Sequence, residues 1–234
     1  MKPVVNVALR ALGALLTYPG PELRAALPDI ASVLEADTGL RRSDKLALHA
    51  LIDGLVAAEP LEAEEAYVAL FDRGRHTSLN LFEHVHGESR DRGPAMVDLL
   101  QTYARAGFEP ACSELPDYLP MLLEFLSLRP GDEASAMLGD CAHILRSLGE
   151  ALRDRDSRYA AVFSALLRVA GESGLGPRSR PAAPAPERSL DEEWADAEVV
   201  FGPGAARECG VAGAGAPVQP IHFMPGTPHK GAMP

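Results

Sequence analysis

The sequence predicts an all-α fold, in which a single bundle of about eight or nine helices is followed by a tail rich in proline and glycine. From residue 4 to about residue 173, apolar residues recur at spacings of three and four, as on the buried face of a helix. No run alternates apolar and polar residues over the length of a strand, and no Asn-Gly or Asp-Gly pair joins two such runs. With 47% hydrophobic residues, the chain can bury a core of ordinary size.

Prolines, glycines and capping residues divide this periodic part into segments. A Pro-Gly pair ends the first segment, and Pro21 suits the first turn of the second, in which Pro28 is expected to produce a kink. Ser43 and Asp132 are predicted N-caps, and Gly107 is a predicted helix end. The predicted helices cover residues 4–18, 21–36, 43–58, 60–71, 77–87, 93–107, 116–128, 132–156 and 157–173.

The composition changes sharply where this periodic part ends. We interpret residues 1–175 as one all-helical domain, and residues 176–234 as a low-complexity, flexible tail that cannot bury a core of its own. Residues 190–201 form a short acidic segment within the tail. Trp194 and Phe201 in this segment are candidates for a second docking contact with a partner, against the alternative of a tail that only adds solubility.

Charge, hydropathy and cysteine content argue against several classes of partner and indicate the cellular compartment. A formal net charge of −11 argues against nucleic acid or an anionic membrane surface, because both require clustered Lys and Arg. No 18 consecutive apolar residues occur, so we expect no direct insertion into a membrane. Cys112, Cys141 and Cys209 are widely spaced and form no CxxC, which argues against a disulfide framework and favours a reducing compartment. We therefore expect a cytoplasmic protein.

The segment SLNLFEHVHGESRDRG, residues 78–93, concentrates charged residues and histidines, and a metal-dependent enzyme would use Glu83, His84, His86 and Asp91 from it. Residues two apart on a helix point about 200° apart, so the two histidines cannot easily share one ion. No matching second Glu-x-x-His pair occurs, and no nucleophile-elbow, phosphate-loop or dinucleotide-binding motif appears in a fitting context. We therefore predict no enzyme activity, no bound metal and no cofactor.

A surface that binds another protein is the favoured interpretation of the same segment. Acids and arginines alternate at Glu88, Arg90, Asp91 and Arg92, although such a run taken alone is usually a solvated loop.

The motif ELPDYLP, residues 114–120, strengthens that interpretation. Two prolines bracket an acid and an aromatic residue. Glu114 and Asp117 could face a groove that accepts a cationic peptide. Alternatively, Pro116 begins a helix with Asp117 in its first turn, where the helix dipole favours a carboxylate.

Two longer strings point to a family. AYVALFDRGRHTSLNLFEHVHGESRDRGPAMVDLLQTYARAGF and the following ELPDYLPMLLEFLSL closely resemble respiratory nitrate reductase delta chains, the NarJ-type molybdenum cofactor assembly chaperones. These belong to a wider group of all-helical molybdoenzyme chaperones whose hallmark is Glu-x-Pro-Asp-His/Tyr, here Glu114-Leu-Pro116-Asp117-Tyr118. The resemblance covers roughly residues 1–173 and is densest over residues 66–128.

The resemblance implies a chaperone that is not an enzyme. Such proteins bind the catalytic alpha subunit of nitrate reductase in the cytoplasm, including its N-terminal leader-like peptide. They hold the apoenzyme competent for molybdenum cofactor insertion before it docks on the membrane. It further implies contacts with cofactor-biosynthesis proteins, and a chaperone of a different molybdoenzyme is the alternative.

On this interpretation the partner-binding residues come from both segments. Tyr118, Leu119, Leu122 and Phe125 are candidates for an apolar groove wall, against the alternative that most of them are core. The predicted partner-binding residues are Glu114, Pro116, Asp117, Tyr118, Pro120, His86, Glu88, Arg90, Asp91 and Arg92.

Overall fold

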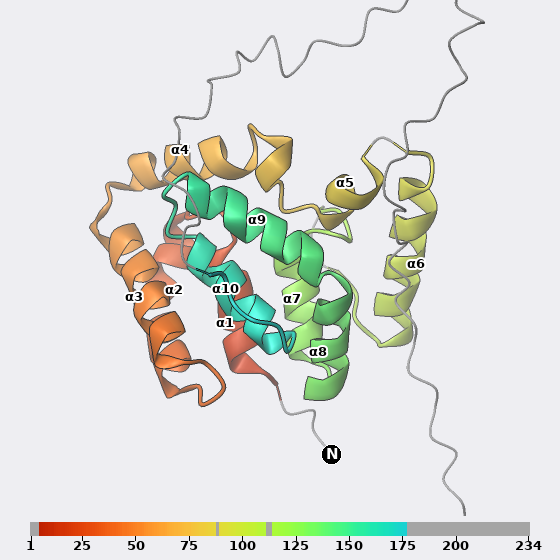
Figure 1. Ribbon diagram of the computed structural model, residues 1–234, viewed down its shortest axis with the longest axis horizontal. Coiled ribbons are helices and arrows are strands. Elements are labelled where there is room, and N and C mark those ends of the chain that lie inside the picture. Colours follow the sequence, from red (N-terminus) through yellow and green to blue (C-terminus); the bar gives the residue numbers. More distant parts are fainter. Residues whose placement is uncertain (1–4, 88, 111–113, 177–234) are drawn as a thin grey trace, which may run out of the picture. The chain divides into compact units, whose positions relative to one another are not determined.

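Helices follow one another with short connections through the computed structural model (Figure 1). The structure describes residues 5–87, 89–110 and 114–176. Within these ranges there are ten α-helices, one 3₁₀-helix and no β-sheet, which confirms the all-α prediction. The elements are α1 (Val7–Leu15), α2 (Pro21–Ala36), α3 (Arg42–Ala57), α4 (Pro60–Phe71), η1 (Arg75–Thr77), α5 (Leu81–His86), α6 (Arg92–Arg105), α7 (Leu119–Ser127), α8 (Gly131–Asp140), α9 (Ala142–Asp154) and α10 (Ala160–Val169).

The first helix, α1, is central to the bundle and packs against α7, α2 and α10. The Asn6 side chain caps it by accepting a hydrogen bond of 3.0 Å from the Leu9 amide. At Gly13 the helix approaches α7 so closely that a Cβ would lie 3.1 Å from Leu123 Cβ and 3.3 Å from the Pro120 carbonyl oxygen. A larger residue at this position would push α1 and α7 apart.

The C-terminal helices α9 and α10 complete the core. In α9 the fully buried residues Ile144, Leu145, Leu148 and Leu152 fall on one face, which packs on α10 around Phe163. This is the three-to-four periodicity on which the sequence prediction rests.

A buried ion pair joins α3 to α10. Asp44, in the first turn of α3, is 4% exposed, and its Oδ2 lies 2.6 Å from Nε of Arg168. Neither atom has an aligned hydrogen-bond partner, so the contact is a close ion pair rather than a well-directed hydrogen bond. Loss of either partner is expected to lower the stability of the fold, because the remaining charge would be incompletely solvated at this site.

Several predicted boundaries differ from the observed ones. The predicted helix 132–156 is two helices, because the backbone at Cys141 leaves the α-helical region with φ −103° and ψ 11°. The buried Cys141 thiol donates to the carbonyls of Met137 and Leu138 and so satisfies two acceptors in the last turn of α8. Ser43 and Asp132 are not N-caps, since α3 and α8 begin one residue before them. α2 contains Pro28 within its length, and the kink predicted there stays a prediction.

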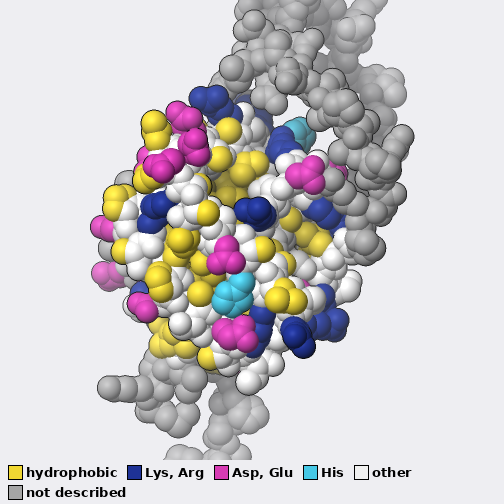
Figure 2. All heavy atoms as spheres, turned by 90° about the vertical axis from the view of Figure 1, so that its left-hand side faces the viewer, with side chains coloured by type: hydrophobic (Ala, Val, Ile, Leu, Met, Phe, Trp, Pro, Cys, Tyr) yellow, Lys and Arg dark blue, Asp and Glu magenta, His cyan; other side chains and the backbone are white. Residues whose placement is uncertain are grey.

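The surface of the bundle mixes charged and apolar side chains. Figure 2 shows the face that carries α3, where apolar side chains lie between groups of acidic and basic ones. No helix among the described residues is both long and apolar enough to span a membrane. Apart from Gly176, the predicted tail lies outside the described residues, so its boundary stays a prediction.

Candidate functional site

A groove of about 860 Å³ lies between α1, α2, α7 and the segment that precedes α7. Three predicted partner-binding residues, Glu114, Tyr118 and Pro120, line it. A concave site of this size with an apolar lining and few polar groups is the usual form of a binding pocket. The complete lining is Arg10, Gly13, Ala14, Thr17, Tyr18, Gly20, Pro21, Glu22, Leu23, Ala26, Phe108, Pro110, Glu114, Tyr118, Pro120, Met121 and Glu124.

The walls of the groove are largely apolar. Leu23 and Ala26 come from α2, Met121 comes from α7, and Phe108 comes from the connection after α6. Gly13 contributes to the lining at a close approach of α1 to α7. The groove therefore offers an apolar strip that the side chains of a partner can bury.

The charge of the groove is acidic. Glu22, Glu114 and Glu124 line it, against the single guanidinium of Arg10. Arg10 lies 3.1 Å from Glu124, but their side chains are 57% and 49% exposed, so the pair is solvated and weak. A cationic partner therefore gains favourable contacts along the rim.

Two tyrosines flank the apolar strip. The Tyr18 side chain is half exposed, and its hydroxyl donates to Oε2 of Glu64 at 2.9 Å. The Tyr118 hydroxyl lies 3.4 Å from the Tyr67 hydroxyl, which in turn donates to the Leu16 carbonyl at 2.8 Å. The partly buried bond of Tyr118 holds its ring at the groove before any partner binds, which lowers the entropic cost of binding, whereas the bond of Tyr18 is exposed to solvent.

Asp117 does not face the groove, contrary to the sequence-based expectation that it would do so beside Glu114. Its side chain is fully buried, and its Oδ2 accepts a hydrogen bond of 2.8 Å from the Phe82 amide. The Asp117 carbonyl also accepts from the Leu81 amide, at 3.1 Å. Asp117 thus satisfies the first two amides of α5 from a position 35 residues away in the chain. The expectation that it lies in the first turn of a helix is also wrong, because α7 begins at Leu119.

The surroundings of Asp117 act on the pKa of its carboxyl in opposite directions. Burial raises the pKa of this carboxyl, while the Phe82 amide and the nearby Arg92 guanidinium lower it in part. Arg92, the first residue of α6, also lies 3.2 Å from Glu83 of α5. The second carboxylate oxygen of Asp117 is buried with no hydrogen-bond partner. Asp117, Glu83 and Arg92 therefore hold α5 and the start of α6 beside the segment that carries Tyr118.

Asp117→Asn is expected to change how stability depends on pH. Because the pKa of Asp117 is raised in the folded protein, its contribution to stability is greatest below its unfolded pKa and falls as the pH rises through the folded pKa. Asn keeps an acceptor for the Phe82 amide and does not titrate. The stability of Asp117→Asn relative to the natural chain should therefore be more favourable at pH 7 than at pH 4, as measured by urea unfolding.

Two further variants control this experiment. Asp117→Ala also removes the acceptor and should be less stable than Asp117→Asn by about 1–3 kcal/mol at both pH values. Asp98→Asn, at an exposed position of α6, should leave stability and its pH dependence unchanged. A relative stability of Asp117→Asn that does not vary with pH would contradict the assignment.

Pro116 and Leu119 of the ELPDYLP motif lie in the interior, whereas Leu115 is exposed. Pro116 is buried, and its carbonyl accepts a hydrogen bond of 2.7 Å from the Tyr103 hydroxyl. Leu119, Leu122 and Phe125 are core residues rather than a groove wall. Of the four apolar-wall candidates, only Tyr118 lines the groove.

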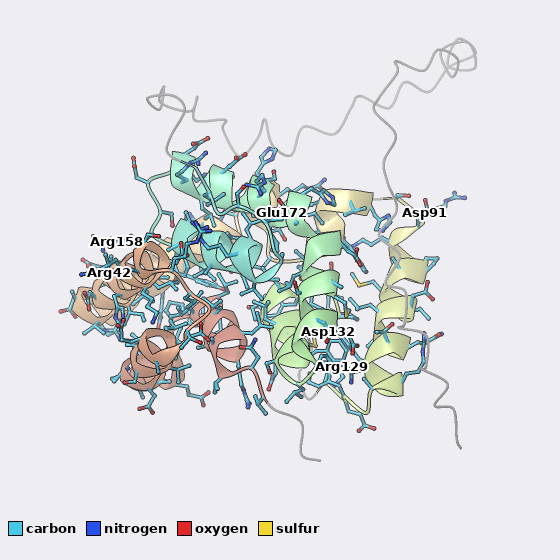
Figure 3. The ribbon with its side chains drawn as sticks, turned by 60° about the horizontal axis from the view of Figure 1, so that its bottom comes forward. Arg42, Asp91, Arg129, Asp132, Arg158 and Glu172 are labelled. Carbon is cyan, nitrogen blue, oxygen red and sulfur yellow. The ribbon has the colours of Figure 1, made fainter. Side chains whose placement is uncertain are left out.

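The predicted rim residues from 83–93 do not line the groove. His86 is partly buried and packs its ring edge-on against Phe82, at 5.6 Å between ring centres. Arg90 is exposed. Just before α6, the Ser89 hydroxyl donates to Oδ2 of Asp91 and accepts from the Asp91 amide. Figure 3 shows Asp91 at the outer end of α6, across the bundle from α2 and α3. Glu88, Trp194 and Phe201 lie outside the described residues, so their predicted roles stay predictions.

The residues of the alternative metal site have other partners. His84 Nε2 lies 2.8 Å from the Ser78 carbonyl oxygen, and Glu83 pairs with Arg92. Among the described residues, no three His, Cys, Asp or Glu side chains are grouped as metal ligands would be.

The part of the groove that comes from α1 and α2 was not predicted from the sequence. Arg10, Tyr18, Glu22 and Leu23 are contributed by this N-terminal part of the chain. The signal available was the turn TYPGPE, residues 17–22, which places an aromatic residue and an acid around a Pro-Gly pair.

Comparison with known proteins adds a family context to this geometry. Residues 22–165 match the family described as "Nitrate reductase delta subunit". The chain is 40% identical over 203 residues to "Nitrate reductase molybdenum cofactor assembly chaperone NarJ" of Escherichia coli K12, with 83% of this chain and 85% of that protein covered. It is 39% identical over 198 residues to "Probable nitrate reductase molybdenum cofactor assembly chaperone NarW" of the same strain, with 82% and 83% covered. A probable NarJ of Bacillus subtilis is 33% identical over 170 residues, with 73% and 91% covered.

Proposed function

The chain belongs to the nitrate reductase delta subunit family, and from this premise we propose that it is an assembly chaperone that binds the catalytic subunit of respiratory nitrate reductase. Its relatives are named as molybdenum cofactor assembly chaperones, so the chain is not expected to be an enzyme. The observation that carries the proposal is the acidic groove, because it joins an apolar strip to three carboxylates in a member of this family.

The groove suits the N-terminal leader-like peptide of the catalytic subunit. An amphipathic helix would place its apolar face on Leu23, Phe108 and Met121, as helical peptides do in apolar grooves. Basic residues at the edge of that helix would meet Glu22 and Glu114 in charge-assisted contacts. Recognition then needs both an apolar face and positive charge, which distinguishes an immature subunit from most folded proteins.

Binding at one end of the client leaves the rest of the client free. The chaperone would hold the apoenzyme in the cytoplasm in a state open to insertion of the molybdenum cofactor, and would leave before the subunit docks on the membrane. Asp117 would act indirectly, by positioning the segment that carries Tyr118. The exposed Arg90 and Asp91 of the 83–93 segment would contact a different part of the client from the groove.

Affinity capture from cells that respire nitrate tests this function. The tagged full chain, expressed from its own promoter, should co-purify the nitrate reductase catalytic subunit, and more of it when molybdenum cofactor synthesis is blocked. Mass spectrometry identifies the captured subunit. Enrichment of the catalytic subunit of another molybdoenzyme in its place would assign the chain to a different client, and capture of neither would reject the proposal.

A further inference from the structure

The acidic groove also has a candidate occupant within the chain itself. The described residues end at Gly176, and 58 further residues follow in the sequence of 234. The tail is divided by charge. Five acids lie within residues 190–201, whereas no Asp or Glu follows Glu208.

The last part of the tail, residues 217–234, has the chemistry that the groove accepts. Its sequence, PVQPIHFMPGTPHKGAMP, combines the apolar residues Ile221, Phe223 and Met224 with two histidines and Lys230. Phe223 and its neighbours match the apolar strip of the groove, and Lys230 matches its carboxylates. The acidic segment 190–201 would be repelled by the same carboxylates. Residues 177–189 carry three arginines but no large apolar residue for the strip, so only residues 217–234 combine positive charge with such residues.

Proline adds to this match. Proline-rich segments dock into grooves lined by aromatic side chains, at a low entropic cost because proline restricts the free chain. Tyr18, Tyr118 and Phe108 provide such a lining.

The intervening chain is long enough for this contact. Residues 177–220 separate Gly176 from Ile221, and a flexible chain of that length spans about 35–40 Å on average. A helical domain of about 170 residues has a radius of gyration of about 15–16 Å, so the groove lies within reach from any point of its surface. Because both partners belong to one chain, the effective concentration of the tail is high, and a weak contact suffices for substantial occupancy.

We infer that residues 217–234 occupy the acidic groove in the free protein and compete with the client peptide for it. The competition rests on the proposed function, whereas the contact between tail and groove does not. The tail thereby lowers the apparent affinity of the groove for weak or incorrect peptides, and a matching client displaces it. A tail bound for two thirds of the time weakens client binding about threefold.

Methionine methyl NMR tests the contact directly. The chain has six methionines; Met121 lines the groove, while Met96 and Met137 lie elsewhere in the domain. The ¹³C-methyl resonance of Met121 should differ between the full chain and a chain that ends at Ala216, because Phe223 places an aromatic ring beside it. The Met96 and Met137 resonances should not differ. Phe223→Asp in the full chain should move Met121 to its position in the shortened chain, and the matched control Ala212→Asp should not.

Binding of a fluorescent peptide tests the competition. The probe is a synthetic peptide with the N-terminal sequence of the nitrate reductase catalytic subunit encoded in the same genome. Ending the chain at Ala216, or Phe223→Asp, should tighten binding of the probe about threefold or more, and Ala212→Asp should leave it unchanged.

Each other outcome has a distinct meaning. Identical Met121 resonances with equal affinities of the full and shortened chains overturn the inference. A Met121 difference that grows with protein concentration also overturns it, because the groove is then filled by a second copy of the chain. Failure of the probe to bind either chain counts against the proposed function, and the Met121 comparison still decides whether the tail occupies the groove.

Discussion

The double substitution Glu22→Lys with Glu114→Lys is expected to weaken binding of the client's N-terminal peptide by about 30- to 100-fold. Both side chains are exposed and line the groove, so the fold should tolerate the change. An exposed charge contact contributes about 0.5–1 kcal/mol, and reversing its sign adds a repulsion of similar size. Two reversals therefore cost about 2–3 kcal/mol of binding free energy.

Fluorescence anisotropy at two salt concentrations measures this effect. The natural chain should bind more weakly as salt is raised, while the variant should lose most of that dependence, because salt screens exposed charges. Asp53→Lys with Asp98→Lys is the matched control, since both residues are exposed, lie outside the groove and change the net charge equally. A loss of affinity that is equal in both double variants would assign the effect to overall charge and count against the groove.

Asp44→Ala is expected to lower the free energy of unfolding by about 3 kcal/mol. The substitution leaves Arg168 without its partner in a site where its side chain is only 20% exposed. The loss is at the lower end of the range for buried pairs, because partial exposure lets water reach the guanidinium. For a domain of this size the midpoint of thermal unfolding should fall by about 6–10 °C.

Two variants separate the ion pair from other effects of this substitution. Asp53→Ala, on the exposed side of the same helix, should change stability by less than about 0.5 kcal/mol. Replacing both partners by apolar residues, Asp44→Leu with Arg168→Met, should recover much of the loss, since no charge is then left unpaired. A double variant as unstable as Asp44→Ala would show that the shape of the site, and not the charge, determines the loss.

Periodicity predicted most of the fold because burial of one helix face leaves a direct trace in the sequence. The buried residues of α9 illustrate this, and so do the proline at the start of α2 and the helix ends near Gly87 and Gly107. The break at Cys141 left no comparable trace, because the apolar pattern continues across it and the cause is a local change in backbone conformation. The true starts of α3 and α8 were also missed, since capping statistics locate a helix start only to within a residue or two.

The site was predictable only where its residues are close in sequence. The ELPDYLP motif identified Glu114, Tyr118 and Pro120, which do line the groove. The opposite wall comes from residues about 100 positions earlier, and no local pattern records that α1 packs against both α2 and α7. The burial of Asp117 was likewise hidden, because its partner amides belong to a helix 35 residues upstream.

The long-range cap on α5 has a consequence for synthesis on the ribosome. A helix of six residues is too short to be stable by itself, and its first two amides, those of Leu81 and Phe82, bond to acceptors of Asp117. The antiparallel bridge between Asn80 and Tyr118 likewise forms only after Tyr118 has been synthesised. α5 therefore cannot become stable until the polypeptide has emerged from the exit tunnel as far as Tyr118, and the segment between η1 and α6 stays accessible to nascent-chain proteases and folding factors until then.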